Sequence, residues 1–163
     1  MVEAISAAVI GAGISSLSTI QSNFDNVNRN CKVNFYNETD DPFDIVDAHK
    51  WYGWVNESEG NQATGRVEKK QCGMIYMRKR GDNATGCTYT FVIEFKSGKR
   101  VSIYVSVGYS CSNQLGCDEG NVIPQDIKDW DHAPKDKVYE KGGKRIRIEM
   151  NNKSCATCNI WIS

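Results

Sequence analysis

The sequence predicts a mainly-β protein, a β-sandwich flanked by an N-terminal amphipathic helix and a second short helix. The first observation is a succession of about eight or nine short segments with strand character, separated by turn residues. The second is that residues 3–24 form the only long segment with helical character. The third is the length of 163 residues, which suits one domain with a hydrophobic core. We therefore expect residues 1–30 to form the helix and a hinge, and residues 31–163 to form the sandwich.

The helical segment is unusual because residues 4–22 carry no charge. At about 100° per residue its larger apolar side chains fall on one half of a helical wheel: Ile5, Val9, Ile10, Ile14, Leu17 and Ile20. Small residues fill the other half. About 20 residues at roughly 1.5 Å each could cross a bilayer. Four interpretations stay open: a helix packed on the β core, a signal peptide, a permanent anchor, or a segment that inserts into a membrane conditionally.

The polar residues 25–30 break this helix, and short strands follow. The strongest signal is the pair 87–95 and 100–109, whose short polar connection predicts a hairpin. Pro124 suits the first turn of the second helix, expected within residues 123–133. The other expected strands are 32–37, 43–46, 50–55, 66–70, 72–80, 144–150 and 158–163.

Three large aromatic residues, Trp51, Tyr52 and Trp54, lie within four positions. Because side chains alternate between the two faces of a strand, a flat strand cannot bury all three. Tyrosine and tryptophan are favoured where one end of the side chain is apolar and the other wet, including membrane interfaces. This cluster therefore marks either a membrane-contacting rim or ordinary core and edge packing.

Lysine plus arginine and aspartate plus glutamate number 20 each, so the net charge is zero. This balance argues against non-specific nucleic-acid binding and against simple electrostatic attraction to anionic lipid. The two histidines, His49 and His132, lie in no nucleophile or metal motif. We therefore expect no catalytic residue, no metal and no cofactor, and a protein that is not an enzyme.

Seven cysteines and four N-glycosylation sequons, at Asn37, Asn56, Asn83 and Asn152, predict a secreted, disulfide-bonded protein in which one thiol is free or pairs between chains. We expect Cys111 and Cys117 to close a polar loop. The spacing of Cys155 and Cys158 is compatible with zinc or redox chemistry, but in a secreted β domain it favours disulfide bonding.

Residues 76–122 resemble the actinoporins, the pore-forming cytolysins of sea anemones. The resemblance rests on Tyr76, Lys79-Arg80-Gly81, Ala84-Thr85-Gly86, the predicted hairpin, Val105-Ser106-Val107-Gly108-Tyr109 and Asn121-Val122. Ala8–Ala12 and the closing residues Asn159–Ser163 also fit in register. Gly108 stands where the family has proline, and the loop after it lacks the aromatic cluster that contacts phosphocholine. Tyr139 alone remains where the family's second helix carries several tyrosines.

The resemblance implies that a soluble monomer docks on a membrane, and that its N-terminal helix then inserts and oligomerises with copies from neighbouring protomers. The expected membrane-binding residues are Trp51, Tyr52, Trp54, Ser106, Gly108, Tyr109 and Tyr139. The expected partner is sphingomyelin, another lipid headgroup or a cell-surface glycan. The expected function is thus a secreted pore-forming cytolysin that acts on a target cell membrane. The alternative is a non-lytic extracellular lectin or lipid-binding module on a similar sandwich.

Overall fold

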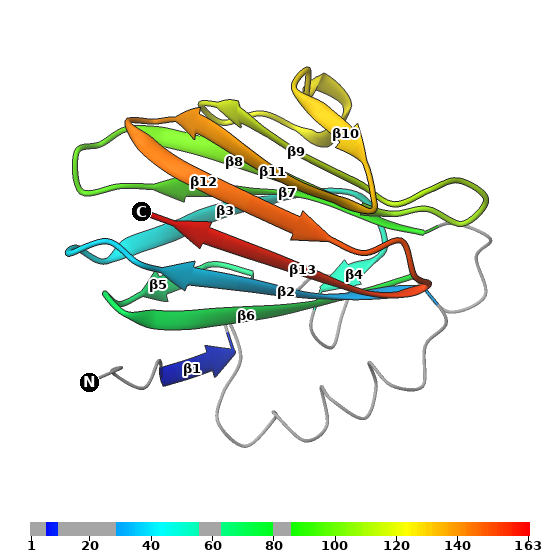
Figure 1. Ribbon diagram of the computed structural model, residues 1–163, viewed down its shortest axis with the longest axis horizontal. Coiled ribbons are helices and arrows are strands. Elements are labelled where there is room, and N and C mark those ends of the chain that lie inside the picture. Colours follow the sequence, from blue (N-terminus) through cyan, green and yellow to red (C-terminus); the bar gives the residue numbers. More distant parts are fainter. Residues whose placement is uncertain (1–5, 10–28, 56–62, 80–85) are drawn as a thin grey trace.

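The computed structural model describes residues 6–9, 29–55, 63–79 and 86–163, which form two β-sheets packed face to face (Figure 1). Among these residues no α-helix occurs. The elements are β1 (Ser6–Val9), β2 (Asn30–Asn37), β3 (Phe43–Tyr52), β4 (Trp54–Val55), β5 (Gly65–Val67), β6 (Gln71–Arg78), β7 (Cys87–Glu94), β8 (Arg100–Val107), β9 (Gln114–Glu119), the 3₁₀ turn η2 (Pro124–Asp126), β10 (Trp130–His132), β11 (Lys135–Lys141), β12 (Lys144–Met150) and β13 (Cys155–Ile162).

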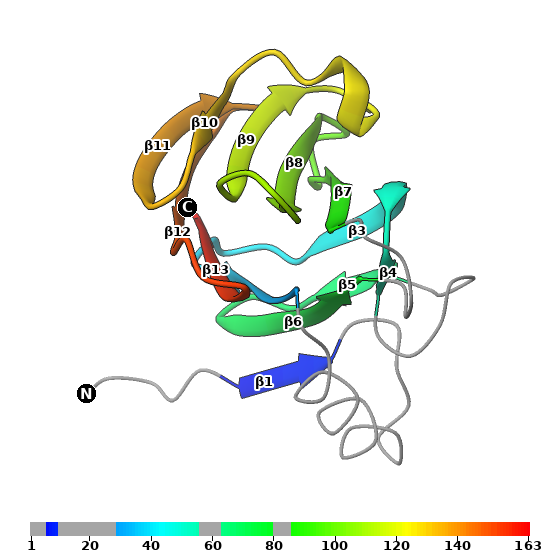
Figure 2. The same ribbon diagram turned by 90° about the vertical axis from the view of Figure 1, so that its right-hand side faces the viewer.

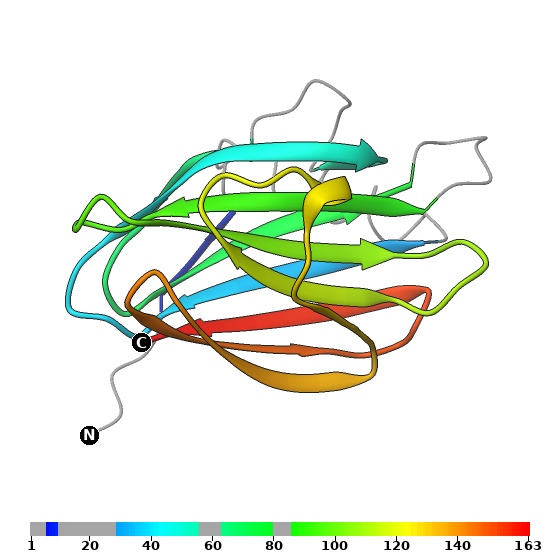
Figure 3. The ribbon, with the colours of Figure 1, turned by 90° about the horizontal axis from the view of Figure 1, so that it is seen from above.

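The first sheet has the strand order β1-β6-β2-β13-β12-β11, with β4 also paired to β6, and the second has the order β10-β9-β8-β7-β3-β5. The end-on view shows the two layers curving toward each other at β10 and β11, and the view from above shows the strands running along the long axis (Figures 2 and 3). The predicted hairpin is confirmed, because β7 and β8 pair from Cys87↔Val107 to Glu94↔Arg100. The predicted β-sandwich is therefore confirmed.

Alternation along the strands builds the core between the sheets. Val33 and Phe35 of β2 point inward from the first sheet, and Phe91 and Ile103 do so from β7 and β8. The rings of Phe35 and Phe91 meet edge to face, with centroids 5.7 Å apart and planes at 83°. This contact joins the two sheets at their centre, because each ring is fully buried and comes from a different layer.

The helix predicted over residues 3–24 is wrong at residues 6–9, which form strand β1. This strand runs parallel to β6, from Ser6↔Gln71 to Val9↔Met74. The edge of a sheet carries unpaired N–H and C=O groups that can form hydrogen bonds with another strand. Residues 6–9 pair with β6 in this way instead of forming helical hydrogen bonds. The other residues of the expected apolar helix face, Ile5, Ile10, Ile14, Leu17 and Ile20, lie outside the described residues. In the part of the chain that is described, no helix is long and apolar enough to cross a membrane.

The second predicted helix is also wrong, apart from one 3₁₀ turn at Pro124–Asp126. The chain beyond it is extended, because Trp130 and His132 pair with Gly116 and Gln114 of β9. Gly116 makes this approach possible, since a Cβ there would lie 2.8 Å from the Cβ of Trp130. The helical turn that begins at Pro124 therefore does not continue, because β10 forms hydrogen bonds with the edge of β9.

The expectation of disulfides is wrong, because all seven cysteines are free thiols. Cys111 is exposed while Cys117 is buried in β9, so the two do not close the predicted loop. Cys155 and Cys158 lie on the same strand, β13, where the first is exposed and the second faces the core. Three residues along a strand place side chains on opposite faces, which keeps the two sulfurs apart.

The first sequon asparagine is also inaccessible in this fold. Asn37 is 2% exposed, and its Nδ2 donates to the backbone oxygens of Asp41 and Val67 at 2.9 and 3.1 Å. A side chain held in this way cannot carry a glycan without unfolding of the turn around it.

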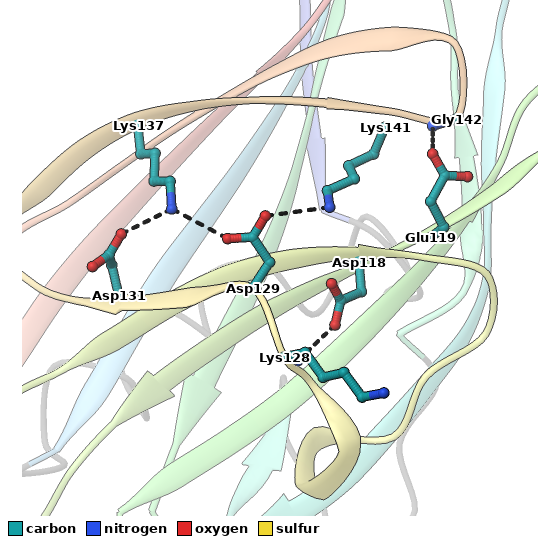
Figure 4. A network of polar contacts seen from close by, with 8 residues as sticks. All are labelled: Asp118, Glu119, Lys128, Asp129, Asp131, Lys137, Lys141 and Gly142. Atoms are coloured by element: carbon teal, nitrogen blue, oxygen red, sulfur yellow. Dashed lines mark hydrogen bonds and ion pairs between the residues drawn. The ribbon is translucent and has the colours of Figure 1, made fainter.

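An ion-pair network closes the sandwich where the edge strands β10 and β11 meet (Figure 4). The Lys137 ammonium lies 3.2 Å from a carboxylate oxygen of Asp129 and 2.9 Å from one of Asp131, and Lys141 lies 3.2 Å from Asp129. The Lys137 hydrogen bond lowers the pKa of Asp131. Burial would raise the pKa of Asp129, but hydrogen bonds from Lys137 and Lys141 outweigh it and lower that pKa. The network thus links the two sheets along one edge, at β10 and β11.

Candidate functional site

Trp51 and Tyr52 stand exposed where β3 ends. Each is 42% exposed, and their rings stack with centroids 5.4 Å apart and planes at 16°. A register shift between Lys50 and Tyr52 in the pairing of β3 with β7 lets two consecutive side chains lie on the same side. The prediction that part of the aromatic cluster must be exposed therefore agrees with the positions of these two rings.

Trp54, the third member of the cluster, is half-buried instead. It lies on β4, opposite Arg78 of β6, and the Arg78 guanidinium carbon lies 4.3 Å from the centroid of its ring. Gly53 allows the tight change of direction between β3 and β4, with a φ of 91° that glycine tolerates. Trp54 thus packs back on the first sheet, while Trp51 and Tyr52 face outward from the second.

Tyr109 is the third exposed aromatic residue at this end of the sandwich, and it is 45% exposed. The cations of Arg29 and Lys79 lie 5.4 and 5.9 Å from the centroid of its ring. Nη2 of Arg29 also donates to the backbone oxygen of Tyr109 at 3.1 Å. Arg29 adopts a φ of 86°, a conformation that costs a non-glycine residue on the order of 1 kcal/mol. We call the end of the sandwich that carries Trp51, Tyr52, Trp54, Tyr109 and these cations the aromatic end; it lies at the right of Figure 1.

A polar hollow of about 460 Å³ opens beside Tyr109. Its lining comes from the start of β2, the β8–β9 loop and the β12–β13 loop: Arg29, Gly108, Tyr109, Ser110, Cys111, Ser112, Asn113, Asn152, Lys153 and Ser154. Asn113 holds the two loops together. Its Nδ2 donates to the backbone oxygens of Asn151 and Lys153 at 3.0 and 2.8 Å, and its backbone N–H donates to Oδ1 of Asn152 at 2.9 Å.

The remaining residues expected at a membrane-binding site lie in different surroundings. Ser106 is buried, its hydroxyl hydrogen-bonds that of Thr88 at 2.7 Å, and it does not line the hollow. Gly108 lines the hollow, and a Cβ there would lie 2.4 Å from Sγ of Cys111. Tyr139 is 3% exposed within the core, under the Lys137 ammonium, and does not join the aromatic end. Trp51, Tyr52, Gly108 and Tyr109 thus lie at the same end of the sandwich, while Ser106 and Tyr139 are buried.

The sequence analysis missed the cations and the amide that complete this end. Arg29 and Lys79 reach Tyr109 because β2 and β6 pair at Asn30↔Arg78, next to both residues. Asn113 meets the β12–β13 loop from about 40 positions away along the chain. A sequence pattern carries no signal for either meeting, since both depend on how distant strands are ordered in the first and second sheets.

Each histidine contacts two side chains. Nε2 of His49 hydrogen-bonds Oδ1 of Asn121, and Nδ1 of His132 hydrogen-bonds the hydroxyl of Ser112 at 2.7 Å. Nε2 of His49 also lies 3.5 Å from a carboxylate oxygen of Asp47, and the ring of His132 meets that of Trp130 edge to face, with centroids 5.1 Å apart. No group of three or more His, Cys, Asp or Glu side chains in the described ranges is placed to hold a metal ion.

Comparison with solved structures finds similar folds. The crystal structure of the lipid-binding protein Nakanori matches with a TM-score of 0.71 at 13% identity, over 90% of this chain and 79% of that chain. The RahU protein, solved in complex with a TRIS molecule, matches with a TM-score of 0.53 at 7% identity, over 83% of this chain and 94% of that chain. No protein-family model and no curated protein matches the sequence. At these identities the likeness shows the fold, a two-sheet β-sandwich, and not membership of the actinoporins.

Proposed function

We propose that this protein binds membrane lipid through its aromatic end. The observation that carries the proposal is the gathering of three exposed aromatic rings, Trp51, Tyr52 and Tyr109, at one end of the sandwich beside a polar hollow. Tryptophan and tyrosine prefer the membrane interface, where the ring enters the headgroup layer and its polar atom stays hydrated. The similarity in fold to the lipid-binding protein Nakanori supports this proposal.

Burial of the three rings alone does not supply enough free energy for tight membrane binding. Moving the exposed part of one ring out of water is worth about 1.5–2 kcal/mol, so three contribute roughly 5 kcal/mol. That free energy corresponds to a Kd on the order of 0.1–1 mM, which gives reversible and weak attachment. Polar contacts to a headgroup in the hollow beside Tyr109 would supply the remaining affinity and the choice of lipid.

Cosedimentation with lipid vesicles tests the proposal. The double variant Trp51→Ala/Tyr52→Ala should lose most vesicle binding, by about 100-fold in affinity for two rings. Val138→Ala is the control, because Val138 is an apolar side chain that is 39% exposed but lies on β11, at the edge of the first sheet, and does not line the hollow. Equal binding by the double variant and the wild type would contradict the proposal. A protein that binds glycans but no vesicle would instead favour the lectin alternative.

Pore formation is the second candidate. It is favoured by the uncharged segment 4–22 and by the position of β1, whose described pairing is four residues along the outer edge of β6. In this candidate the protein is a secreted, non-enzymatic cytolysin whose N-terminal segment leaves the edge of the sheet and oligomerises in the target membrane. Dye release from vesicles tests it: release should be lost when residues 1–24 are deleted, while vesicle binding is kept. Binding without release by the full chain would restrict the function to lipid binding.

A further inference from the structure

We propose that the headgroup accepted beside Tyr109 is an anionic phospholipid headgroup, one whose phosphate is not balanced by a choline. This inference rests on the proposed membrane binding and adds the class of lipid. It is carried by two features of the aromatic end: the sign of the charge around the hollow and the occupation of the aromatic ring faces.

Among the described residues that line the hollow, those that carry a charge are positive. Arg29 and Lys153 line it, and the Lys79 ammonium lies 5.9 Å from the ring centroid of Tyr109 at its rim. None of the described residues that line the hollow carries a carboxylate. Lys79 and Lys153 form no ion pair with any carboxylate in the described parts of the chain. The hollow is therefore locally positive, although the net charge of the whole chain is zero.

Three described carboxylates are paired with lysines outside the lining of the hollow. Asp129 and Asp131 are held by Lys137 and Lys141 at the β10–β11 edge, and Asp41 pairs with Lys96 at 3.2 Å at the opposite end of the sandwich. Each of these carboxylates is paired with a lysine of its own and does not line the hollow, so its charge is largely offset where it lies.

Two aromatic rings at this end, those of Trp54 and Tyr109, already carry cations of the protein itself. Arg78 lies over Trp54 at 4.3 Å, and Arg29 and Lys79 lie near Tyr109 at 5.4 and 5.9 Å. Choline is recognised when its quaternary ammonium contacts converging ring faces that carry no other cation. Here a choline would meet like charge instead, whereas a phosphate oxygen would meet two or three cations.

The hollow also offers hydrogen-bond donors of the kind that phosphate oxygens accept. Ser110 and Ser154 line it together with Arg29 and Lys153, and so does Ser112, whose hydroxyl also hydrogen-bonds His132. Its volume of about 460 Å³ is within the range of pockets that hold small ligands, roughly 300–1,000 Å³. Charge-assisted hydrogen bonds to phosphate are the strong ones, so these groups favour an uncompensated phosphate over a zwitterion.

The experiment compares binding of the full chain to vesicles of phosphatidylcholine alone, phosphatidylcholine with sphingomyelin, and phosphatidylcholine with phosphatidic acid. We expect affinity for the phosphatidic acid vesicles to be higher by at least about tenfold and to fall as salt is raised. Lys79→Gln and Lys153→Gln should each reduce that affinity about fivefold. Lys96→Gln is the matched control, since it removes an exposed lysine from the opposite end. Thermal melting shows that each variant is folded.

The outcomes separate this inference from the proposed function. Equal affinity for all three vesicles, still abolished by Trp51→Ala/Tyr52→Ala, would overturn the anionic preference and leave membrane binding standing. A preference for the anionic vesicles that Lys96→Gln weakens as much as Lys79→Gln and Lys153→Gln would place the site elsewhere and overturn the inference. Failure to bind any vesicle would overturn both proposals.

Discussion

The guanidinium carbon of Arg78 lies 4.3 Å from the centroid of the Trp54 ring, across the pairing of β4 with β6. This contact gives Trp54 a different role from Trp51, although the two are separated by two residues only. Trp54 follows the end of β3 in the second sheet and packs against Arg78 of β6 in the first sheet. Trp51 instead stacks on its neighbour Tyr52 and is exposed to solvent.

Alanine substitution should separate the two roles. Trp54→Ala removes a half-buried ring and its contact with a cation, so we expect it to lower the free energy of unfolding by about 2–4 kcal/mol. Trp51→Ala should lower it by about 1 kcal/mol or less and weaken vesicle binding. Urea unfolding of the two variants measures the difference. Equal destabilisation by both would contradict the division.

Gly108 is expected to be intolerant of any side chain. A Cβ at this position would lie 2.4 Å from Sγ and 2.7 Å from the backbone oxygen of Cys111, and the backbone atom cannot swing away. Gly108→Ala should therefore destabilise the protein by about 1–3 kcal/mol through displacement of the β8–β9 loop. Ser110→Ala, in the same loop and exposed, is the control with an expected change below about 0.5 kcal/mol. Identical melting temperatures for Gly108→Ala and wild type would refute this reasoning.

The reactivity of the thiols tests the assignment of seven free cysteines. Cys111 and Cys155 are exposed and should react with a thiol reagent in the native protein. The other five are buried; burial raises the pKa of Cys87 to about 12, so almost no reactive thiolate is present at neutral pH. We expect two labels on the native protein and seven after denaturation without reductant. Fewer than seven after denaturation would reveal disulfides and contradict the structure.

The β10–β11 network predicts an acid-sensitive edge. Lys137 lowers the pKa of Asp131, and Lys137 with Lys141 lowers that of Asp129 against the effect of burial. A carboxylate with a lowered native pKa stabilises the fold above its unfolded pKa, about 3.9, and this contribution is lost as the pH falls through the lower native value. The melting temperature should therefore fall below about pH 4, less steeply in Asp131→Asn and Lys137→Met. Parallel pH profiles in wild type and both variants would contradict this role.

The sequence predicted much of the sandwich because its strands alternate clearly. The hairpin of β7 and β8, the strand Lys144–Met150 and the closing strand at Trp161 all follow from period-two patterns. The predictions failed where a distant partner decides the local structure. Ser6–Val9 is a strand because the edge of β6 is there to pair with, and Trp130 is extended because Gly116 leaves room beside it.

Only part of the candidate site could be predicted from the sequence. The alternation argument predicted that some of the rings at 51, 52 and 54 would be exposed, but not which, because a register shift places the consecutive side chains of Trp51 and Tyr52 on the same side. Arg29, Lys79 and Asn113 were not predictable, because their partners lie 30 to 80 positions away and meet them only through the order of the strands. Tyr139 was expected at the membrane-binding surface from its place in the family pattern, but its side chain is buried.

The most direct test of membrane binding through the aromatic end uses the protein's own tryptophans. The chain has four, so phenylalanine at the other three leaves a single reporter, either Trp51 or Trp161. Trp161 lies on β13 beside Tyr36, toward the opposite end of the sandwich. Vesicles whose lipids carry bromine on the acyl chains quench only an indole that enters the membrane. The account predicts strong quenching of the Trp51 reporter and little quenching of the Trp161 reporter. Equal quenching of both, or quenching of Trp161 alone, would show that another surface meets the membrane.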